Sequence, residues 1–208
     1  MEELEQLSII PVDYAVLRSL FADYHSPRNK IANIEQAGKI IRLKRGMYVV
    51  SPEVSKQLLS VELIANHIYG PSYVSMESAL RYYGLIPEQV YTVRSLTVNR
   101  SKSFENSIAN FEYITTNNTY YAIGIKQEII ENRYTFLIAT PEKALCDMIT
   151  ATPHLRIQSE KALVAYLKED LRFDMSGLEM MDSNIVRECL EVGKKKEALQ
   201  ILLNYLES

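Results

Sequence analysis

Several features are scarce in this sequence, and each absence excludes a class of protein. There is no tryptophan, and no stretch approaches the roughly 20 consecutive apolar residues that a membrane-spanning helix needs. The two cysteines, Cys146 and Cys189, lie far apart within apolar helical patterns, which predicts buried free thiols without a disulfide. His25, His67 and His154 have no cysteine or carboxylate at ligand spacing. We therefore expect no metal site and no catalytic histidine.

Signals for export and for common enzyme chemistry are also missing. The N-terminus, MEELEQLSII, is acidic where a secretory signal would be basic and then apolar. No glycine-rich phosphate loop and no nucleophile elbow occurs. We expect a cytoplasmic protein that is not an enzyme and uses no cofactor. Its 208 residues, 47% of them hydrophobic, suffice for one large or two small globular domains.

A nuclease is the enzymatic alternative, and it rests on Glu77 in SMESAL and on Glu142-Lys143 in TPEKAL. A metal-dependent nuclease of the restriction type would place an Asp on one strand and Glu-x-Lys on the next. Here Glu142 and Lys143 are adjacent and should diverge on a helix. Both glutamates suit the first turn of a helix, where the helix dipole favours an anion. The sequence therefore disfavours a nuclease.

Acidic residues are nearly absent from one stretch of an otherwise acidic chain. The net charge is −3, but residues 25–50 carry six lysines and arginines against Glu35 alone, which leaves −8 for the rest. Such a local concentration of positive charge indicates a polyanionic partner. The six cations are Arg28, Lys30, Lys39, Arg42, Lys44 and Arg45.

The same stretch has a recognisable order of elements. Asp13 can cap a first helix, and Ser26-Pro27 begins a second one that Gly38 ends. The segment KIIRLKRGMYVV, residues 39–50, then predicts a β-hairpin that turns at Gly46. Helix, helix and hairpin are the parts of a winged helix-turn-helix. We predict this domain over residues 1–52, ending where Ser51-Pro52 breaks the pattern.

Residues 53–208 predict a second, mixed α/β domain, so the fold class is α+β. A helix should include Leu58, and another should start at Ser75. Residues 90–139 contain strand-like segments, namely VYTVRSLTV, NFEYIT, YYAIGI and RYTFLIA, with NRSKSFENS as a turn. They predict a small sheet of about four strands. Helices follow over residues 141–207, the first capped by Thr140 with Pro141 in its first turn.

A winged helix-turn-helix binds DNA by placing a helix in the major groove while its basic hairpin holds phosphates. The predicted DNA-binding residues fall on both parts, and the alternative is a solvated basic face without a partner. They are Arg28, Asn29 and Lys30 on the second helix and Lys39, Arg42, Lys44 and Arg45 on the hairpin.

Four segments, in order between Ile40 and Ile149, carry a family resemblance: IRLKRGMYVV, GPSYVSMESALRYYGLIPE, VYTVRSLTVNRSKSFENSIANFEYI and IATPEKALCDMI. The chain resembles the AbiEi family, the antitoxin and repressor half of bacterial type IV toxin–antitoxin pairs. The resemblance implies binding to repeats in the protein's own promoter. It also implies neutralisation of a nucleotidyltransferase-like toxin without a stable complex. A homodimer is a further possibility.

In that family, basic residues of the second domain are associated with the antitoxin role. Arg94, Arg100 and Lys102 are the matching positions, and a charged edge of the sheet explains them equally well. A different alternative is a protein-interaction module with an incidental basic hairpin. The basis for this alternative is the fourteen tyrosines, which include the pairs Tyr82-Tyr83 and Tyr120-Tyr121. We expect one tyrosine of each pair to face solvent, where it could contact a partner protein.

Overall fold

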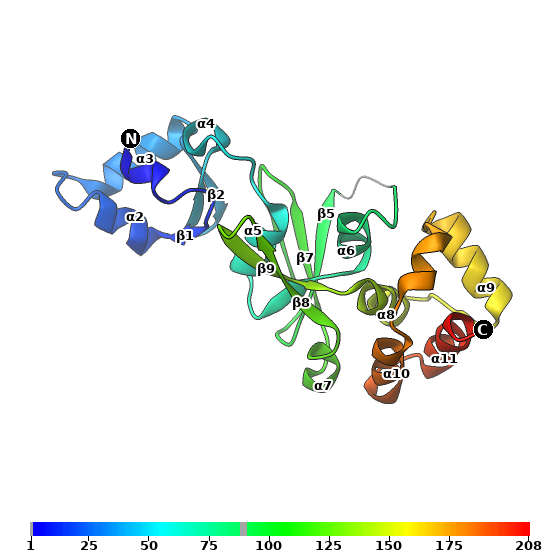
Figure 1. Cartoon of the computed structure of the whole chain (residues 1–208). Helices are drawn as coiled ribbons and strands as arrows, with labels where there is room; N and C mark the ends of the chain where they lie inside the picture. The colour runs from blue at the N-terminus through cyan, green and yellow to red at the C-terminus, as the bar shows by residue number, and fades with distance from the viewer. Residues whose placement is uncertain (1, 88–90) are drawn as a thin grey trace.

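Two β-sheets organise the computed structural model, which describes residues 2–87 and 91–208 (Figure 1). One sheet has three antiparallel strands in the order β1-β3-β2, and the other has six strands in the order β6-β7-β5-β4-β9-β8. Helices flank both, so the predicted α+β class is confirmed. Glu88 and Val90, which end one predicted segment and begin another, lie outside the described residues.

In the N-terminal unit, which comprises α1 to α4, the helices and strands begin and end close to where the sequence predicts them. The carboxylate of Asp13 accepts a hydrogen bond from the Val16 N–H at 2.9 Å and so caps α2. Pro27 opens α3, and Gly38 and Gly46 adopt positive φ angles of 69° and 79° after α3 and in the hairpin turn. The elements are α1 (Glu2–Glu5), β1 (Val12–Asp13), α2 (Tyr14–Leu20), α3 (Pro27–Gln36), β2 (Ile40–Lys44), β3 (Met47–Val50) and α4 (Pro52–Ser55).

The β2–β3 hairpin is buried on both faces. Ile40, Tyr48 and Val50 belong to a small core formed with α2 and α3. Leu43 and Val49, 1% and 0% exposed, belong instead to the large core of the rest of the molecule. Successive strand residues point to opposite faces, and here each face has a hydrophobic partner. The hairpin therefore joins the N-terminal unit to the rest of the molecule, which we call the second unit. The sequence, in contrast, predicts a domain boundary just after the hairpin.

The six-stranded sheet mixes parallel and antiparallel pairs. Strand β5 runs parallel to β7, whereas β4 is antiparallel to β5 and parallel to β9. The elements are α5 (Val61–Ile68), β4 (Ser72–Val74), α6 (Met76–Tyr82), β5 (Thr92–Thr97), β6 (Lys102–Glu105), β7 (Asn110–Thr115), α7 (Asn118–Tyr121), β8 (Ile125–Ile130) and β9 (Tyr134–Ala139).

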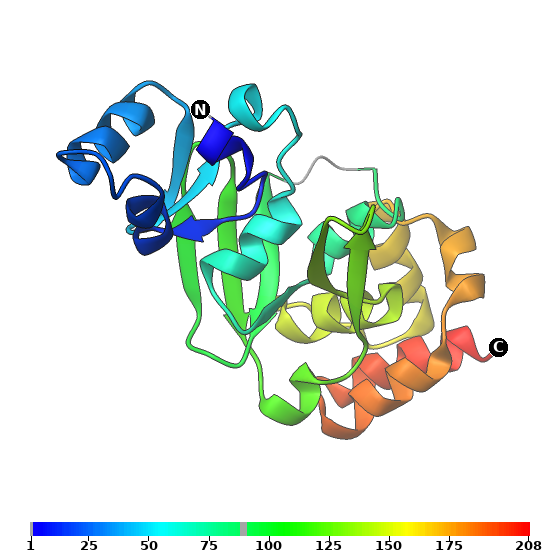
Figure 2. The ribbon, with the colours of Figure 1, turned by 60° about the vertical axis from the view of Figure 1, so that its left-hand side comes forward.

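Helices at the C-terminal end gather on the side away from the N-terminal unit (Figures 1 and 2). As predicted, Thr140 caps the first of them, since its hydroxyl accepts a hydrogen bond from the Lys143 N–H. The elements are α8 (Pro141–Ala151), α9 (Glu160–Ala165), the π-helical turn η1 (Tyr166–Asp170), the 3-10 helix η2 (Met175–Met180), α10 (Ser183–Val192) and α11 (Lys196–Leu206). No helix in the described ranges is both long and apolar enough to cross a membrane.

The sheet is larger than predicted, and three local predictions are wrong. The predicted turn NRSKSFENS contains edge strand β6, whereas YYAIGI holds part of α7 and reaches β8 only at its last residue, Ile125. Leu58 is not helical; it precedes α5 and is 88% exposed. Strand β4 was not predicted, because its three residues are too few to show an alternating pattern.

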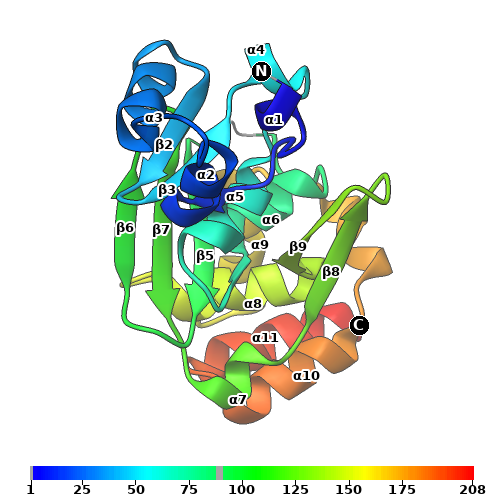
Figure 3. The ribbon, with the colours of Figure 1, turned by 90° about the vertical axis from the view of Figure 1, so that its left-hand side faces the viewer.

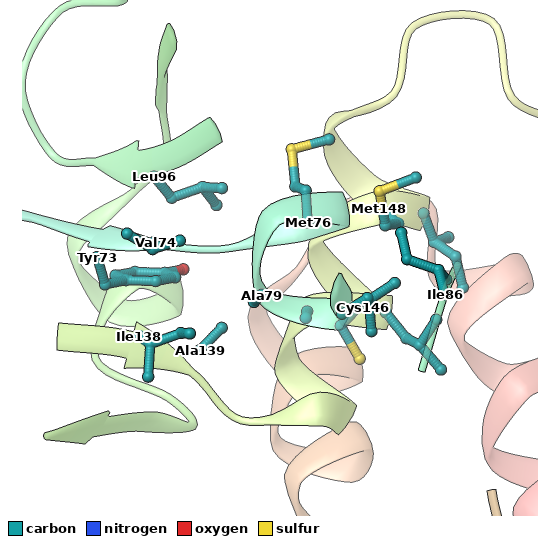
Figure 4. Packing of buried hydrophobic residues seen from close by; sticks show 14 of the residues in the cluster. Tyr73, Val74, Met76, Ala79, Ile86, Leu96, Ile138, Ala139, Cys146 and Met148 are labelled. Carbon is teal, nitrogen blue, oxygen red and sulfur yellow. The ribbon is translucent and has the colours of Figure 1, made fainter. Parts of the chain in front are cut away.

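The large core includes residues of the six-stranded sheet and of helices α5, α6, α8, α10 and α11. Cys146 and Cys189 are both buried and free, which confirms the prediction for the thiols. Figure 4 shows this core with the strand residues Tyr73, Val74, Leu96 and Ile138 on one side and Met76, Ala79, Cys146 and Met148 on the other.

Candidate functional site

The first turn of α3 presents two polar side chains to solvent. Arg28 and Asn29 are exposed, and neither side chain has a polar partner among the described residues. Lys30 is half-buried, with its ammonium 4.6 Å from the centre of the Tyr24 ring and 5.9 Å from that of Phe21. Ser26 makes no side-chain cap and Pro27 has no N–H, so the Ser26 hydroxyl does not occupy the N–H groups of Arg28 and Asn29 in the first turn of α3. This helix start can therefore accept an anion.

The cations of the hairpin differ in their exposure and in their contacts with other groups of the protein. Arg42 forms an ion pair with Glu35 at 2.8 Å, and this hydrogen bond raises the pKa of Arg42. The Arg42 and Glu35 side chains are 53% and 27% exposed, so solvent screens the pair and it contributes at most about 1 kcal/mol. Arg45 at the tip is exposed and has no polar partner within the described ranges, and Lys39 is half-buried.

Lys44 is used inside the molecule. Its ammonium donates a hydrogen bond to the Ile68 carbonyl at the end of α5 and lies 5.8 Å from the centre of the Phe104 ring. Burial and then the nearby Lys102 lower the pKa of Lys44. A cation at a helix C-terminus stabilises that helix. Lys44 therefore holds the hairpin against the second unit and is less available to a ligand than Arg45.

The three basic residues predicted for the second domain do not form one group. Arg94 lies on interior strand β5, where its guanidinium pairs with Glu77 at 2.6 Å and Glu112 at 2.9 Å. Arg94 is therefore neither a free cation nor a charge that protects a sheet edge. Arg100 and Lys102 are both exposed, and Lys102 lies on edge strand β6.

Ser75 of the SMESAL motif and Lys143 of the TPEKAL motif belong to a buried polar network. Lys143 and Asp147, one turn apart on α8, form an ion pair at 3.2 Å with both side chains 0% exposed. The Asp147 carboxylate also accepts hydrogen bonds from Ser75 at 2.6 Å and Tyr73 at 3.1 Å, while Lys143 donates to the Tyr120 carbonyl at 2.9 Å. All of these residues are in the core, so we assign the network to stability. The i, i+4 spacing of Lys143 and Asp147 was the sequence signal for it.

The tyrosines do not make a continuous exposed surface. Only Tyr24, Tyr82 and Tyr91 of the fourteen are exposed, and they belong to three separate segments. Tyr120 is buried, and Tyr83 donates a hydrogen bond to the Ala139 carbonyl. One member of the Tyr82-Tyr83 pair is thus exposed, but the Tyr120-Tyr121 pair is not.

Comparison with known proteins yields a likeness of fold only. No family model and no curated protein matches the chain. Among solved structures, the chain is similar to that described as "Crystal structure of RV2827C protein from Mycobacterium tuberculosis". The TM-score is 0.52 at 12% sequence identity, over 98% of this chain and 78% of that one.

Proposed function

We propose that this protein binds double-stranded DNA through α3 and the β2–β3 hairpin and represses its own promoter. In this proposal residues 1–52 act as a winged helix-turn-helix, with α3 as the recognition helix and the hairpin as the wing. The observation that carries it is the exposure of Arg28, Asn29 and Arg45 without carboxylate partners among the described residues. Lys30, Lys39 and Arg42 add positive charge around them, and Lys44 positions the hairpin.

The physical argument separates two kinds of contact. Recognition helices read base edges with residues near their N-terminus, where Arg28 and Asn29 lie. Phosphate contacts need only a reachable cation, which the exposed Arg45 supplies at the hairpin tip. The protein-interaction alternative has weaker support, since the exposed tyrosines are scattered.

We further propose that the protein is the antitoxin of a type IV pair and counteracts a nucleotidyltransferase-like toxin without a stable complex. This part rests on the resemblance to the AbiEi family between Ile40 and Ile149. A toxin of that class encoded beside this protein, and relieved by its expression, would support the proposal. Unrelieved toxicity on co-expression would contradict it.

Arg45→Ala should weaken binding to every duplex alike, because a phosphate contact carries no sequence information. The slope of log affinity against log salt should fall by about one unit between roughly 50 mM and 200 mM salt. Fluorescence anisotropy with the DNA upstream of the gene and a scrambled duplex measures both. Arg156→Ala removes the same charge from an exposed site in the C-terminal part and should leave the slope unchanged. An unaltered slope in R45A would show that the tip does not contact DNA.

Asn29→Ala should instead change sequence preference. Loss of a bidentate contact with adenine reduces discrimination by about 1–3 kcal/mol at one base pair and leaves the salt slope intact. Competition with duplexes substituted at single positions would locate that base pair. Asn118→Ala, at an exposed helix start in α7, is the matched control. If every substituted duplex competes with N29A as with the parent, Asn29 does not read bases.

A further inference from the structure

The two basic groups that the sequence places in separate domains meet at one aromatic ring. Lys44 of the hairpin and Lys102 of β6 have their ammonium groups 5.8 Å and 4.9 Å from the centre of the Phe104 ring. Lys102 also lies 5.7 Å from the Tyr69 ring centre. The two ammonium groups are therefore within about 11 Å of each other, close to the Debye length at physiological salt. Their positive fields add in the surrounding solvent.

Direct contacts fix the hairpin beside β6. The Asn106 side chain donates a hydrogen bond to the Leu43 carbonyl at 3.1 Å, and the Lys44 ammonium reaches the Ile68 carbonyl. Leu43 is buried in the large core. Because these contacts are made by the two residues just before Arg45, they limit how far Arg45 can move relative to Lys102.

The acids of this region lie elsewhere. Along β6 the side chains alternate, so Lys102 and Phe104 share one face of the sheet and Ser103 and Glu105 take the other. Glu112 is paired with Ser103 in the strand register and forms its ion pair with Arg94, on that opposite face. Figure 3 shows α3, β2 and β6 following one another along one side of the molecule.

We propose that the DNA-binding surface continues from the hairpin tip onto the six-stranded sheet, where Lys102 contacts a backbone phosphate beyond the one held by Arg45. This inference rests on the proposed function and extends it to the second unit. It assigns Lys102 to DNA binding in place of the antitoxin role that the family resemblance implies.

The chemistry of Lys102 suits a phosphate. It is exposed, its stem is supported by the Phe104 and Tyr69 rings, and no carboxylate in the described part of the chain neutralises it. Each DNA strand carries a phosphate every 3.4 Å along the axis. In the proposed complex, one DNA backbone passes both Arg45 and Lys102, and its phosphates relieve the repulsion between Lys102 and Lys44.

The test uses the full chain, with Lys102→Met and Lys102→Arg measured against the upstream duplex and a scrambled duplex. Methionine keeps the stem on the rings while removing the charge, and arginine keeps both. Binding of K102M should release one counterion fewer than binding of the parent. The ratio of its dissociation constants at 200 mM and 50 mM salt should therefore be about threefold smaller on both duplexes. K102R should match the parent. Lys161→Met, at an exposed site of α9, is the control with the same charge change.

The outcomes separate this inference from the proposed function. If the parent binds neither duplex, the proposed function fails, and this inference fails with it. If the parent binds and R45A flattens the salt slope while K102M does not, the DNA surface ends at the hairpin and this inference alone is overturned. Equal flattening in K102M and K161M would also overturn it, since the effect would then come from net charge. A flattened slope in K102M alone, restored in K102R, supports it.

Discussion

Lys143→Met is expected to destabilise the protein by about 3–5 kcal/mol, because it leaves the Asp147 carboxylate buried without its cation. Asp147 would retain the hydrogen bonds from Ser75 and Tyr73, but two neutral donors do not balance a full charge at 0% exposure. Methionine fills similar space, so a cavity is a small part of the loss. Urea unfolding followed by far-UV circular dichroism measures the change.

The double variant Lys143→Met, Asp147→Leu is the control for this prediction. It removes both charges from the core and should recover most of the lost free energy of unfolding, since a buried ion pair and an apolar pair are often of similar stability. If K143M alone unfolds at the parental urea concentration, Asp147 is not ionised in the folded protein.

The pH dependence of K143M has a definite sign. Burial raises the pKa of the Asp147 carboxyl, although Lys143 and the Ser75 hydroxyl partly oppose the shift. With Lys143 gone, the folded state holds this proton more tightly than the unfolded state does. A raised pKa in the folded state means that stability is present at low pH and lost as pH rises through that pKa. The deficit of K143M relative to the parent should therefore shrink as pH falls from 7 toward about 4.

Leu43→Ala is expected to lower the stability of the whole molecule by about 2–5 kcal/mol, although it lies in the N-terminal hairpin. Leu43 is 1% exposed and packs in the core of the second unit. For a protein of this size the melting temperature should fall by on the order of 10 °C. The hairpin and α8 should unfold in one transition, which hydrogen exchange resolved by segment can show.

Leu58→Ala provides the comparison, because Leu58 is 88% exposed and its loss should shift the melting temperature little. Two separate transitions in L43A, with the six-stranded sheet unaffected, would contradict this prediction. They would favour instead independent domains over residues 1–52 and 53–208.

Local signals in the sequence located the elements of the N-terminal unit well. Asp13, Pro27, Gly38 and Gly46 each act through their own backbone or a neighbouring N–H, so their effect is visible in a short window. Thr140 and Pro141 mark the start of α8 for the same reason. Capping chemistry needs no knowledge of distant contacts.

The sites were harder to predict, because distant contacts decide them. Nothing near Lys44 in the sequence shows that its ammonium meets the Ile68 carbonyl, and nothing near Arg94 reveals Glu77 and Glu112 beside it. Ser75 does begin a helix, yet its hydroxyl bonds to Asp147 and does not cap. The sequence therefore predicted the cations of the candidate site but not which of them are free.

If the protein binds DNA as proposed, the packing of the hairpin between two cores also decides how neighbouring copies are placed on the duplex. A DNA-binding domain attached by a flexible linker can adjust to any spacing between its sites, but here the hairpin that packs on α3 is also buried in the core of the six-stranded sheet. In that case, two copies bound to adjacent repeats would take a rotational phase fixed by the number of base pairs between the repeats. Because a turn of the duplex is about 10 base pairs, a change of half a turn moves one body to the far side of the helix.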